Sequence, residues 1–444
     1  MQETMKKARL VILILTAAVM FPGLRLYGEN ERLVFGYTNV RPDGNRLIAG
    51  RGSFPHVRFL DITLSGRPLW VVAAPGNGSS VLVAVLEDGR TEAFSIAKGR
   101  VTKTRVAPER IPAGAPPLLV LKPAVSTLET TLPPETTVLP GSFYLNNYHT
   151  NPVILPLSGR TVAIDKSGNI VVREKDQKGT ITDRTVRINA LPDARILFDE
   201  RERLFILTHP TAEYGHGILG DSLEATRITI VETDPVVRVT KQIPVENGKV
   251  IEGLSPILAD LDGDGMREII VTVSDAKNGA QIAAYSETGE IVGRGPEIGR
   301  GYRWIHQIAV APFGPAGEIE LAAVRTPHIG GVIEYYRLSG GSLRVVAREK
   351  GISSHRIGSR NLDMAVAADF DSDGKTELLV PNETFDTLLL LSRTKEGVEV
   401  ESTYPVDGTV WTNIAAVMSG GEAIVAAVGR EDGVLRVWVP YLYL

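Results

Sequence analysis

A four-strand pattern that recurs along the second half of this 444-residue chain constrains its fold more than any other feature. The clearest copy spans residues 257–294, where short apolar runs alternate with turns rich in Gly, Asp and Asn. A second copy spans residues 364–403, and a degenerate copy lies between them. Asp260 and Asp369 occupy equivalent positions 109 residues apart, which is two periods of about 54 residues. Because one such meander cannot bury both of its faces alone, it must stack on neighbouring copies. The sequence therefore predicts an all-β protein, a β-propeller of four-stranded blades.

The number of blades and the closure of the ring follow less directly. We predict seven blades, with six or eight as alternatives. Residues 411–439 supply only three strands at the C-terminal end, so a fourth strand must come from elsewhere. Residues 33–37 are the predicted closing strand, because closure would hide an otherwise open sheet edge. We expect one propeller domain over residues 29–444, with a Pro/Thr-rich insertion around residues 123–156.

The N-terminal residues 1–28 have the order of a secretory signal peptide. Lys6, Lys7 and Arg9 precede an apolar run from Leu10 to Phe21, which is shorter than the roughly 20 residues of a spanning helix. An uncleaved anchor is the alternative. We therefore expect an extracytoplasmic protein, periplasmic or secreted, that is monomeric and has no membrane span after cleavage. The absence of Cys excludes disulfides and thiolate sites, and a formal net charge of −4 argues against nucleic acid as a partner.

Two acidic loops carry the clearest chemistry. DLDGDGMRE at residues 260–268 and DFDSDGKTE at residues 369–377 place carboxylates at positions 1, 3, 5 and 9, with a backbone carbonyl at position 7. Clustered hard oxygen atoms select Ca²⁺, and the Val at position 12 of each loop excludes an EF-hand. We expect about two calcium sites, with a solvated acidic turn as the alternative. The predicted ligands are Asp260, Asp262, Asp264, Met266 and Glu268 in one loop, and Asp369, Asp371, Asp373, Lys375 and Glu377 in the other.

With DLDGDGMREIIV and DFDSDGKTELLV, these units resemble FG-GAP/VCBS-type repeats, the calcium-loop propeller blades of integrin alpha-subunit heads and of many exported bacterial proteins. The resemblance covers roughly residues 257–403, about a third of the chain. It implies calcium in the loops between the first and second strands, on the lower face of a propeller, and ligand or partner binding on the opposite face. Residues 199–203, 311–318 and 418–422 lack the alternating aspartates, so no calcium is expected there.

The opposite, upper face is the candidate ligand surface. Successive antiparallel strands alternate ends, so the loops between second and third strands and the connections between blades emerge there. Aromatic, Arg and His side chains around a concavity suit a glycan, an acidic saccharide or a peptide; ordinary solvated loops are the alternative. The candidates are His209, His216, Tyr302, Arg303, Trp304, His306, Arg325, His328, His355, Arg356, Asp363 and Trp411.

Two classes of function remain open. The first is a non-catalytic, calcium-stabilised binding or assembly module for a protein or glycan of the cell envelope. The second is an exported polysaccharide lyase or hydrolase, in which Arg neutralises a uronate and His or Tyr removes a proton. No nucleophile elbow or HExxH motif occurs, and no catalytic residue is assigned. A transition-metal site formed by His306, His328 and His355 is a third possibility.

Overall fold

The computed structural model describes residues 33–36, 43–54, 56–76, 79–121, 136–138, 149–176, 178–246, 248–419 and 423–441. The predicted signal peptide lies outside these residues, as do residues 122–135 and 139–148 of the region around the predicted insertion. In the part of the chain that is described, no helix has the length and apolar character needed to cross a membrane.

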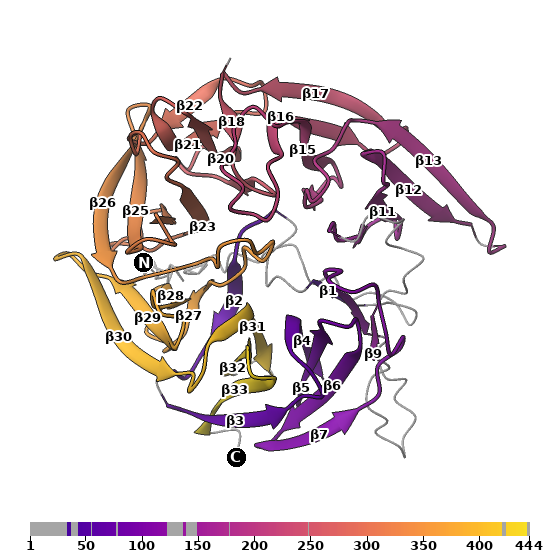
Figure 1. The fold of residues 1–444 in the computed structure, drawn as a ribbon, viewed down its shortest axis with the longest axis vertical. Coiled ribbons are helices and arrows are strands. Elements are labelled where there is room, and N and C mark those ends of the chain that lie inside the picture. The colour runs from indigo at the N-terminus through magenta and orange to yellow at the C-terminus, as the bar shows by residue number, and fades with distance from the viewer. Residues whose placement is uncertain are drawn as a thin grey trace, which may run out of the picture.

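The strands form antiparallel units around a ring, which confirms the predicted all-β propeller (Figure 1). Among the described residues the strands group into seven four-stranded units, three of which are joined into one 13-stranded sheet and one of which is extended by β2 (Leu47–Arg51). Six of them consist of consecutive strands: β4 (Pro68–Gly76), β5 (Ser79–Leu86), β6 (Thr91–Ala97) and β7 (Arg100–Thr104); β10 (Val153–Ile154), β11 (Thr161–Ile164), β12 (Asn169–Lys175) and β13 (Ile181–Arg187); β14 (Leu197–Phe198), β15 (Leu204–Thr211), β16 (Glu224–Glu232) and β17 (Arg238–Pro244); β19 (Ile257–Ala259), β20 (Glu268–Asp275), β21 (Gly279–Tyr285) and β22 (Ile291–Arg294); β23 (Ile305–Ala311), β24 (Glu320–Arg325), β25 (Val332–Ser339) and β26 (Ser342–Lys350); and β27 (Val366–Asp369), β28 (Glu377–Pro381), β29 (Thr387–Arg393) and β30 (Val398–Pro405). The short strand β18 (Val250–Ile251) links β16 to β20.

The seventh unit closes the ring with a strand other than the predicted one. β31 (Val410–Ser419), β32 (Ala423–Arg430) and β33 (Val434–Pro440) are completed by β3 (Val57–Thr63), which runs antiparallel to β33 over its whole length. The prediction that residues 33–37 supply this strand is wrong. β1 (Leu33–Gly36) pairs instead with β8 (Leu118–Leu121) in a three-stranded sheet that also contains β9 (Thr136–Val138). β3 is the better closing strand because it leads directly into β4 of the next unit, and short connections join neighbouring elements. The three-stranded sheet of β1, β8 and β9 comes in addition to the four-stranded units, so the number of blades remains a prediction.

The core lies between the units. Strands β5, β21, β23 and β32 are buried along their full lengths, because each sheet packs against a neighbour on both faces. Polar side chains also join neighbouring inner strands. Asn413 on β31 accepts a hydrogen bond from the backbone N–H of Val71 at 3.0 Å and donates one to its carbonyl at 2.7 Å. Asn45 makes the same pair of bonds to Val310, from the segment before β2 (Leu47–Arg51).

The antiparallel order of the strands gives the ring two distinct ends. Loops between the first and second strands of each unit emerge at one end, which we call the lower face; the predicted calcium loops are β19–β20 and β27–β28. Loops between the second and third strands, and the connections between units, emerge at the other end, the upper face. The predicted metal and ligand residues therefore lie at opposite ends of the fold.

Candidate functional sites at the two ends of the propeller

The first calcium loop brings three of its carboxylates together. Asp260, Asp262 and Glu268 each offer an oxygen atom that lies within 4.8 Å of the other two. Asp260 also accepts hydrogen bonds from the backbone N–H groups of Gly263 at 2.7 Å and Gly265 at 2.9 Å, which hold the turn. Gly265 has a φ of +85°, a left-handed conformation that favours glycine. The local sequence therefore shapes a loop with converging carboxylates.

The second calcium loop repeats this arrangement. One oxygen atom each from Asp369, Asp371 and Glu377 lies within 4.8 Å of the other two. Glu377 is buried and accepts a hydrogen bond from the backbone N–H of Phe370 at 2.7 Å. Burial raises the pKa of Glu377 to about 8, and the neighbouring charge of Asp371 acts in the same direction. Burial likewise raises the pKa of Glu268 in the first loop.

The donors that converge in the two loops fit a hard divalent cation. They are all oxygen atoms, and Oδ1 of Asp369 is buried and has no hydrogen-bond partner within the part of the chain that the structure describes. Asp264 and Asp373 stand outside the converging groups. Each accepts a backbone N–H two residues further on, and Asp373 also pairs with the ammonium group of Lys375 at 2.5 Å. The structure therefore brings together three predicted ligands per loop, while the carbonyl groups of Met266 and Lys375 stay predicted ligands.

On the upper face, loops from several units meet in a buried apolar cluster. It consists of Ile218, Leu219, Leu254, Trp304 and Leu362. These residues come from the β15–β16 loop, from the segment before β19 and from the connections that precede β23 and β27. The cluster fixes the relative positions of the loops that carry the predicted ligand face.

A histidine anchored by a carboxylate lies on this face. Nδ1 of His216 is 2.6 Å from Oε1 of Glu252, which is fully buried and also accepts a hydrogen bond from Ser274. The ring centroids of Tyr214 and Tyr302 lie 6.0 and 5.6 Å from that of His216, and 5.2 Å from each other. Tyr214 is buried, whereas Tyr302 is 50% exposed. We call the rings of Tyr214, His216 and Tyr302 the three-ring surface.

Three further histidines gather around Trp304. Its ring stacks on His306, with centroids 4.8 Å apart and an interplanar angle of 13°, and lies 6.1 Å from His328 and 5.2 Å from His355. Nε2 of His355 is 2.7 Å from the carbonyl oxygen of Ser359, which can only accept, so this nitrogen carries the proton. Nδ1 of neutral His355 then accepts from Nε2–H of His328 at 2.7 Å. Both ring nitrogens of His355 are therefore occupied.

These three histidines are uncharged near neutral pH and do not converge on a metal ion. Burial lowers the pKa of His328 to about 4 and that of His355 to about 3, and it holds the pKa of His306 well below its usual value. Among the described residues, only the two calcium loops bring three His, Asp or Glu ligand atoms within 4.8 Å of one another. The geometry therefore does not support the transition-metal alternative.

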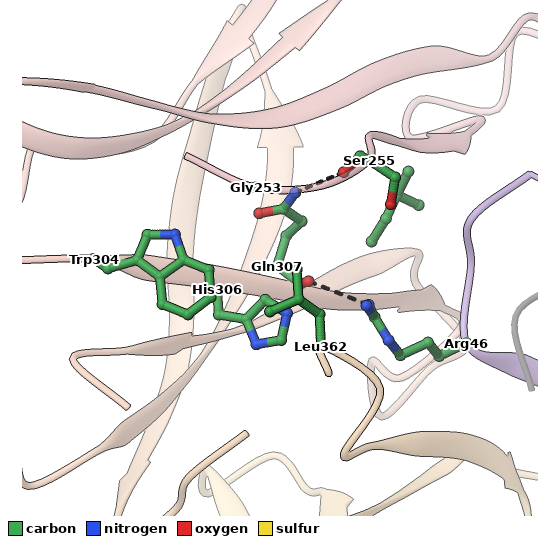
Figure 2. A pocket seen from close by; sticks show the side chains of 8 residues that line it. Arg46, Gly253, Ser255, Trp304, His306, Gln307 and Leu362 are labelled. Carbon is green, nitrogen blue, oxygen red and sulfur yellow. Dashed lines mark hydrogen bonds between the residues drawn. The ribbon is translucent and has the colours of Figure 1, made fainter. Parts of the chain in front are cut away.

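A small polar cavity lies beside Trp304 and His306 (Figure 2). It is lined by Arg46, Gly253, Ser255, Ile257, Trp304, His306, Gln307 and Leu362. Nε2 of His306 is buried and has no hydrogen-bond partner among the described residues, while Arg46 donates to the carbonyl of Gln307 at 3.3 Å. The cavity volume of about 10 Å³ leaves room for about one water molecule, so a saccharide or peptide would have to bind on the surface of the upper face.

The remaining predicted residues of the upper face have separate surroundings. Asp363 is buried and pairs with Arg46 at 2.9 Å, and Arg325 lies 3.8 Å from a carboxylate oxygen of Glu334. Trp411 packs against Arg356. His209 is partly exposed and Arg303 exposed. The structure thus divides the predicted face into three parts: the three-ring surface, the three histidines around Trp304, and the separate pair of Arg356 and Trp411.

Sequence analysis missed the buried acidic groups beneath the upper face. Glu252 anchors His216, and Glu224 lies nearby; burial, followed by the charge of Glu252, raises the pKa of Glu224 to about 10. Arg360 pairs with Asp193 at 3.1 Å and Asp221 at 2.9 Å. Glu252 directly follows the apolar pair Val250–Ile251. The sequence signal for Glu252 is therefore its position directly after an apolar run, because a carboxylate in such a place is seldom fully buried without a partner.

A comparison with known proteins finds no family model and no curated protein that matches the chain. Among solved structures, selenomethionine-substituted virginiamycin B lyase from Staphylococcus aureus is 12% identical, with a TM-score of 0.40 over 86% of this chain and 99% of that one. BBS1N in complex with ARL6DN is 13% identical, with a TM-score of 0.41 over 88% and 94% of the two chains. A streptogramin B lyase structure is 11% identical, with a TM-score of 0.39 over 86% and 97%. Similarities this low transfer no activity, and the FG-GAP/VCBS resemblance stays a prediction.

Proposed function

We propose that this chain is an exported, calcium-stabilised β-propeller that binds a protein or glycan of the cell envelope through its upper face, without catalysing a reaction. The three-ring surface carries this proposal. Its histidine is held by a fully buried carboxylate, and its outer ring, Tyr302, is half exposed. Aromatic side chains that are held in place by buried neighbours and exposed to solvent on their outer side suit saccharide or peptide ligands. They offer apolar area with a polar tip, and they lose little conformational entropy on binding.

The lower face has a structural role in this proposal. The converging carboxylates of the β19–β20 and β27–β28 loops support calcium loops of the FG-GAP/VCBS type. Without a cation, three carboxylates so close together repel one another, and one of each set is buried. Calcium would remove that repulsion when bound. The order of charged and apolar residues over residues 1–28 supports export.

Removing calcium is expected to lower the melting temperature. A ligand that binds only the folded state at about 100 times its Kd stabilises that state by about 2.7 kcal/mol per site. Asp262→Ala should lose part of the calcium-dependent shift, and Asp262→Ala/Asp371→Ala should lose nearly all of it. Differential scanning calorimetry with calcium and with a chelator measures this. Asp176→Ala, in the exposed β12–β13 turn, is the control and should keep the full shift. Equal melting temperatures in both buffers would refute the calcium sites.

Tyr302→Ala is expected to abolish saturable binding to envelope glycans or proteins without changing the melting temperature. Its ring is half exposed and contacts Tyr214 and His216 from outside, so its loss removes the contact area but not buried packing. Tyr441→Ala, another exposed tyrosine beside β33, is the control. Binding of the full chain to purified envelope fractions and to glycan arrays provides the measurement. Unchanged binding by Tyr302→Ala would reject the three-ring surface.

The alternative is an exported polysaccharide lyase or hydrolase, and one observation favours it. A carboxylate that accepts Nδ1–H of His216 leaves Nε2 as a base, which is a familiar arrangement for proton abstraction. Of the candidate bases taken from the sequence, by contrast, His306 and His355 are buried, His328 is partly buried and Tyr302 is half exposed. Release of unsaturated product from a polyuronide by the purified chain would favour this alternative, whereas saturable binding without product favours the binding module.

A further inference from the structure

Two arginine side chains pack against Trp411 at the start of β31. Cζ of Arg356 lies 3.2 Å from the centroid of the Trp411 ring, and Cζ of Arg67 lies 4.7 Å from it. Arg356 comes from the β26–β27 connection and Arg67 from the turn between β3 and β4. At 3.2 Å the guanidinium of Arg356 must lie flat on the indole, since any tilt would bring its nitrogen atoms into the ring. A flat guanidinium directs its N–H groups outward in its own plane.

The two arginines differ in how their charges are satisfied. Arg67 pairs with Glu87 at 2.7 Å. No hydrogen bond or ion pair joins the guanidinium of Arg356 to any residue that the structure describes. Burial lowers the pKa of Arg356, and the charge of Arg67 acts in the same direction against the opposing charge of Glu431. Arginine stays protonated, so Arg356 is a half-buried cation whose best missing partner is an anion.

We propose that Arg356, Arg67 and Trp411 form a binding site for the carboxylate of a uronic-acid saccharide. This proposal rests on the proposed function and names the ligand chemistry of the upper face. The planar guanidinium of Arg356 matches a carboxylate in a two-pronged geometry that lysine cannot reproduce. Arg67, which is paired with Glu87, packs on the same indole, and Trp411 fixes the plane of Arg356 before the ligand arrives.

The surroundings favour a saccharide over an acidic peptide. Trp411 is partly exposed, and its indole N–H makes no hydrogen bond to another described residue. One uronic-acid ring offers a carboxylate for Arg356 and, next to it, hydroxyl groups that can accept the indole N–H. An aspartate or glutamate side chain offers only the carboxylate. The neighbouring histidines His306, His328 and His355 are uncharged, so arginine must supply the charge that attracts the ligand.

Isothermal titration calorimetry of the full chain with a short oligogalacturonate tests the site. Arg356→Gln should raise the Kd by about tenfold or more, as loss of a charge-assisted bidentate contact does. Arg356→Lys, which keeps the charge but not the planar fork, should give an intermediate Kd. Arg300→Gln removes the same charge from an exposed position in the β22–β23 connection, on the same face, and should leave the Kd nearly unchanged. The neutral galactose oligomer should not bind.

Tryptophan emission gives a local readout that does not depend on folding defects. Trp70, Trp304 and Trp438 are at most 5% exposed, so a ligand-induced change in emission reports mainly on Trp411. Oligogalacturonate should change the emission of the wild type and of Arg300→Gln, but not that of Trp411→Phe. No binding by the wild type, equal affinity of Arg356→Gln, or equal binding of the neutral oligomer each overturns the site. A glutamate-rich peptide that binds as tightly overturns the saccharide assignment.

The two proposals fail separately. If Tyr302→Ala loses binding to the envelope while Arg356→Gln keeps full affinity for oligogalacturonate, the upper face stands as a binding surface and the Trp411 site is rejected. If Arg356→Gln loses oligogalacturonate while Tyr302→Ala changes nothing in either assay, the Trp411 site stands and the three-ring surface is rejected.

Discussion

Replacing Glu320 with glutamine is expected to lower the free energy of unfolding by about 3–5 kcal/mol, the usual cost of leaving one member of a buried ion pair alone. Glu320 is fully buried on β24. Its carboxylate accepts hydrogen bonds from Arg393 at 3.0 Å and from Arg337 at 2.6 Å. Arg393 belongs to β29 of the neighbouring unit, and its side chain is only 5% exposed. Without the carboxylate, a buried cation between two units loses its counter-charge.

Two matched variants separate burial from charge. Arg337→Gln removes a partner of the same carboxylate, but the Arg337 side chain is 34% exposed, so the expected loss is about 1 kcal/mol or less. Glu320→Leu/Arg393→Met removes both buried charges and should recover much of the stability that Glu320→Gln loses. Urea unfolding followed by circular dichroism measures all three. Equal losses of unfolding free energy for Glu320→Gln and Arg337→Gln would show that burying the ion pair between units does not increase its contribution to stability.

The fold was predictable because most of its information is local. The four strands predicted over residues 257–294 agree with β19 to β22, since apolar runs and Gly/Asp turns mark each strand and each reversal. The closing strand was not predictable in the same way. Residues 33–37 and Val57–Thr63 both have the composition of an edge strand, and which of them pairs with β33 is decided by a contact between the two ends of the chain.

The two faces also differ in whether their contacts are local in the sequence. The carboxylates of the calcium loops converge within nine consecutive residues, so their spacing alone predicted the groups that the structure assembles. The sequence also predicted that His306 and His355 lie on the upper face. It did not predict that they are buried, because their burial depends on loops from different units that pack around Trp304. Glu252 was missed because its partner His216 is 36 residues away. Arg67 approaches Trp411 from the opposite end of the chain.

Gly279→Ala is expected to destabilise the protein by about 3–5 kcal/mol, because it combines backbone strain with a steric clash. Gly279 begins β21 with a φ of +71°. A Cβ atom there would lie 2.1 Å from the carbonyl oxygen of Gly299 and 2.7 Å from the side chain of Ile298. The facing segment cannot easily withdraw. Gly299 N–H donates to Asn278 at 2.8 Å, and Ile298 N–H donates to Ala280 at 2.9 Å.

A glycine in open space isolates the clash from the strain. Gly317 has a similar φ of +82° with no atom within 4 Å of an added Cβ, so Gly317→Ala should cost only about 1–2 kcal/mol. Urea unfolding of both variants gives the difference. Because the segment that Gly279 contacts continues directly into Tyr302 and Trp304, Gly279→Ala should also weaken binding at the upper face, whereas Gly317→Ala should not. If both variants lose the same stability and both keep full binding, the close approach of Gly279 to Gly299 does not position the upper loops.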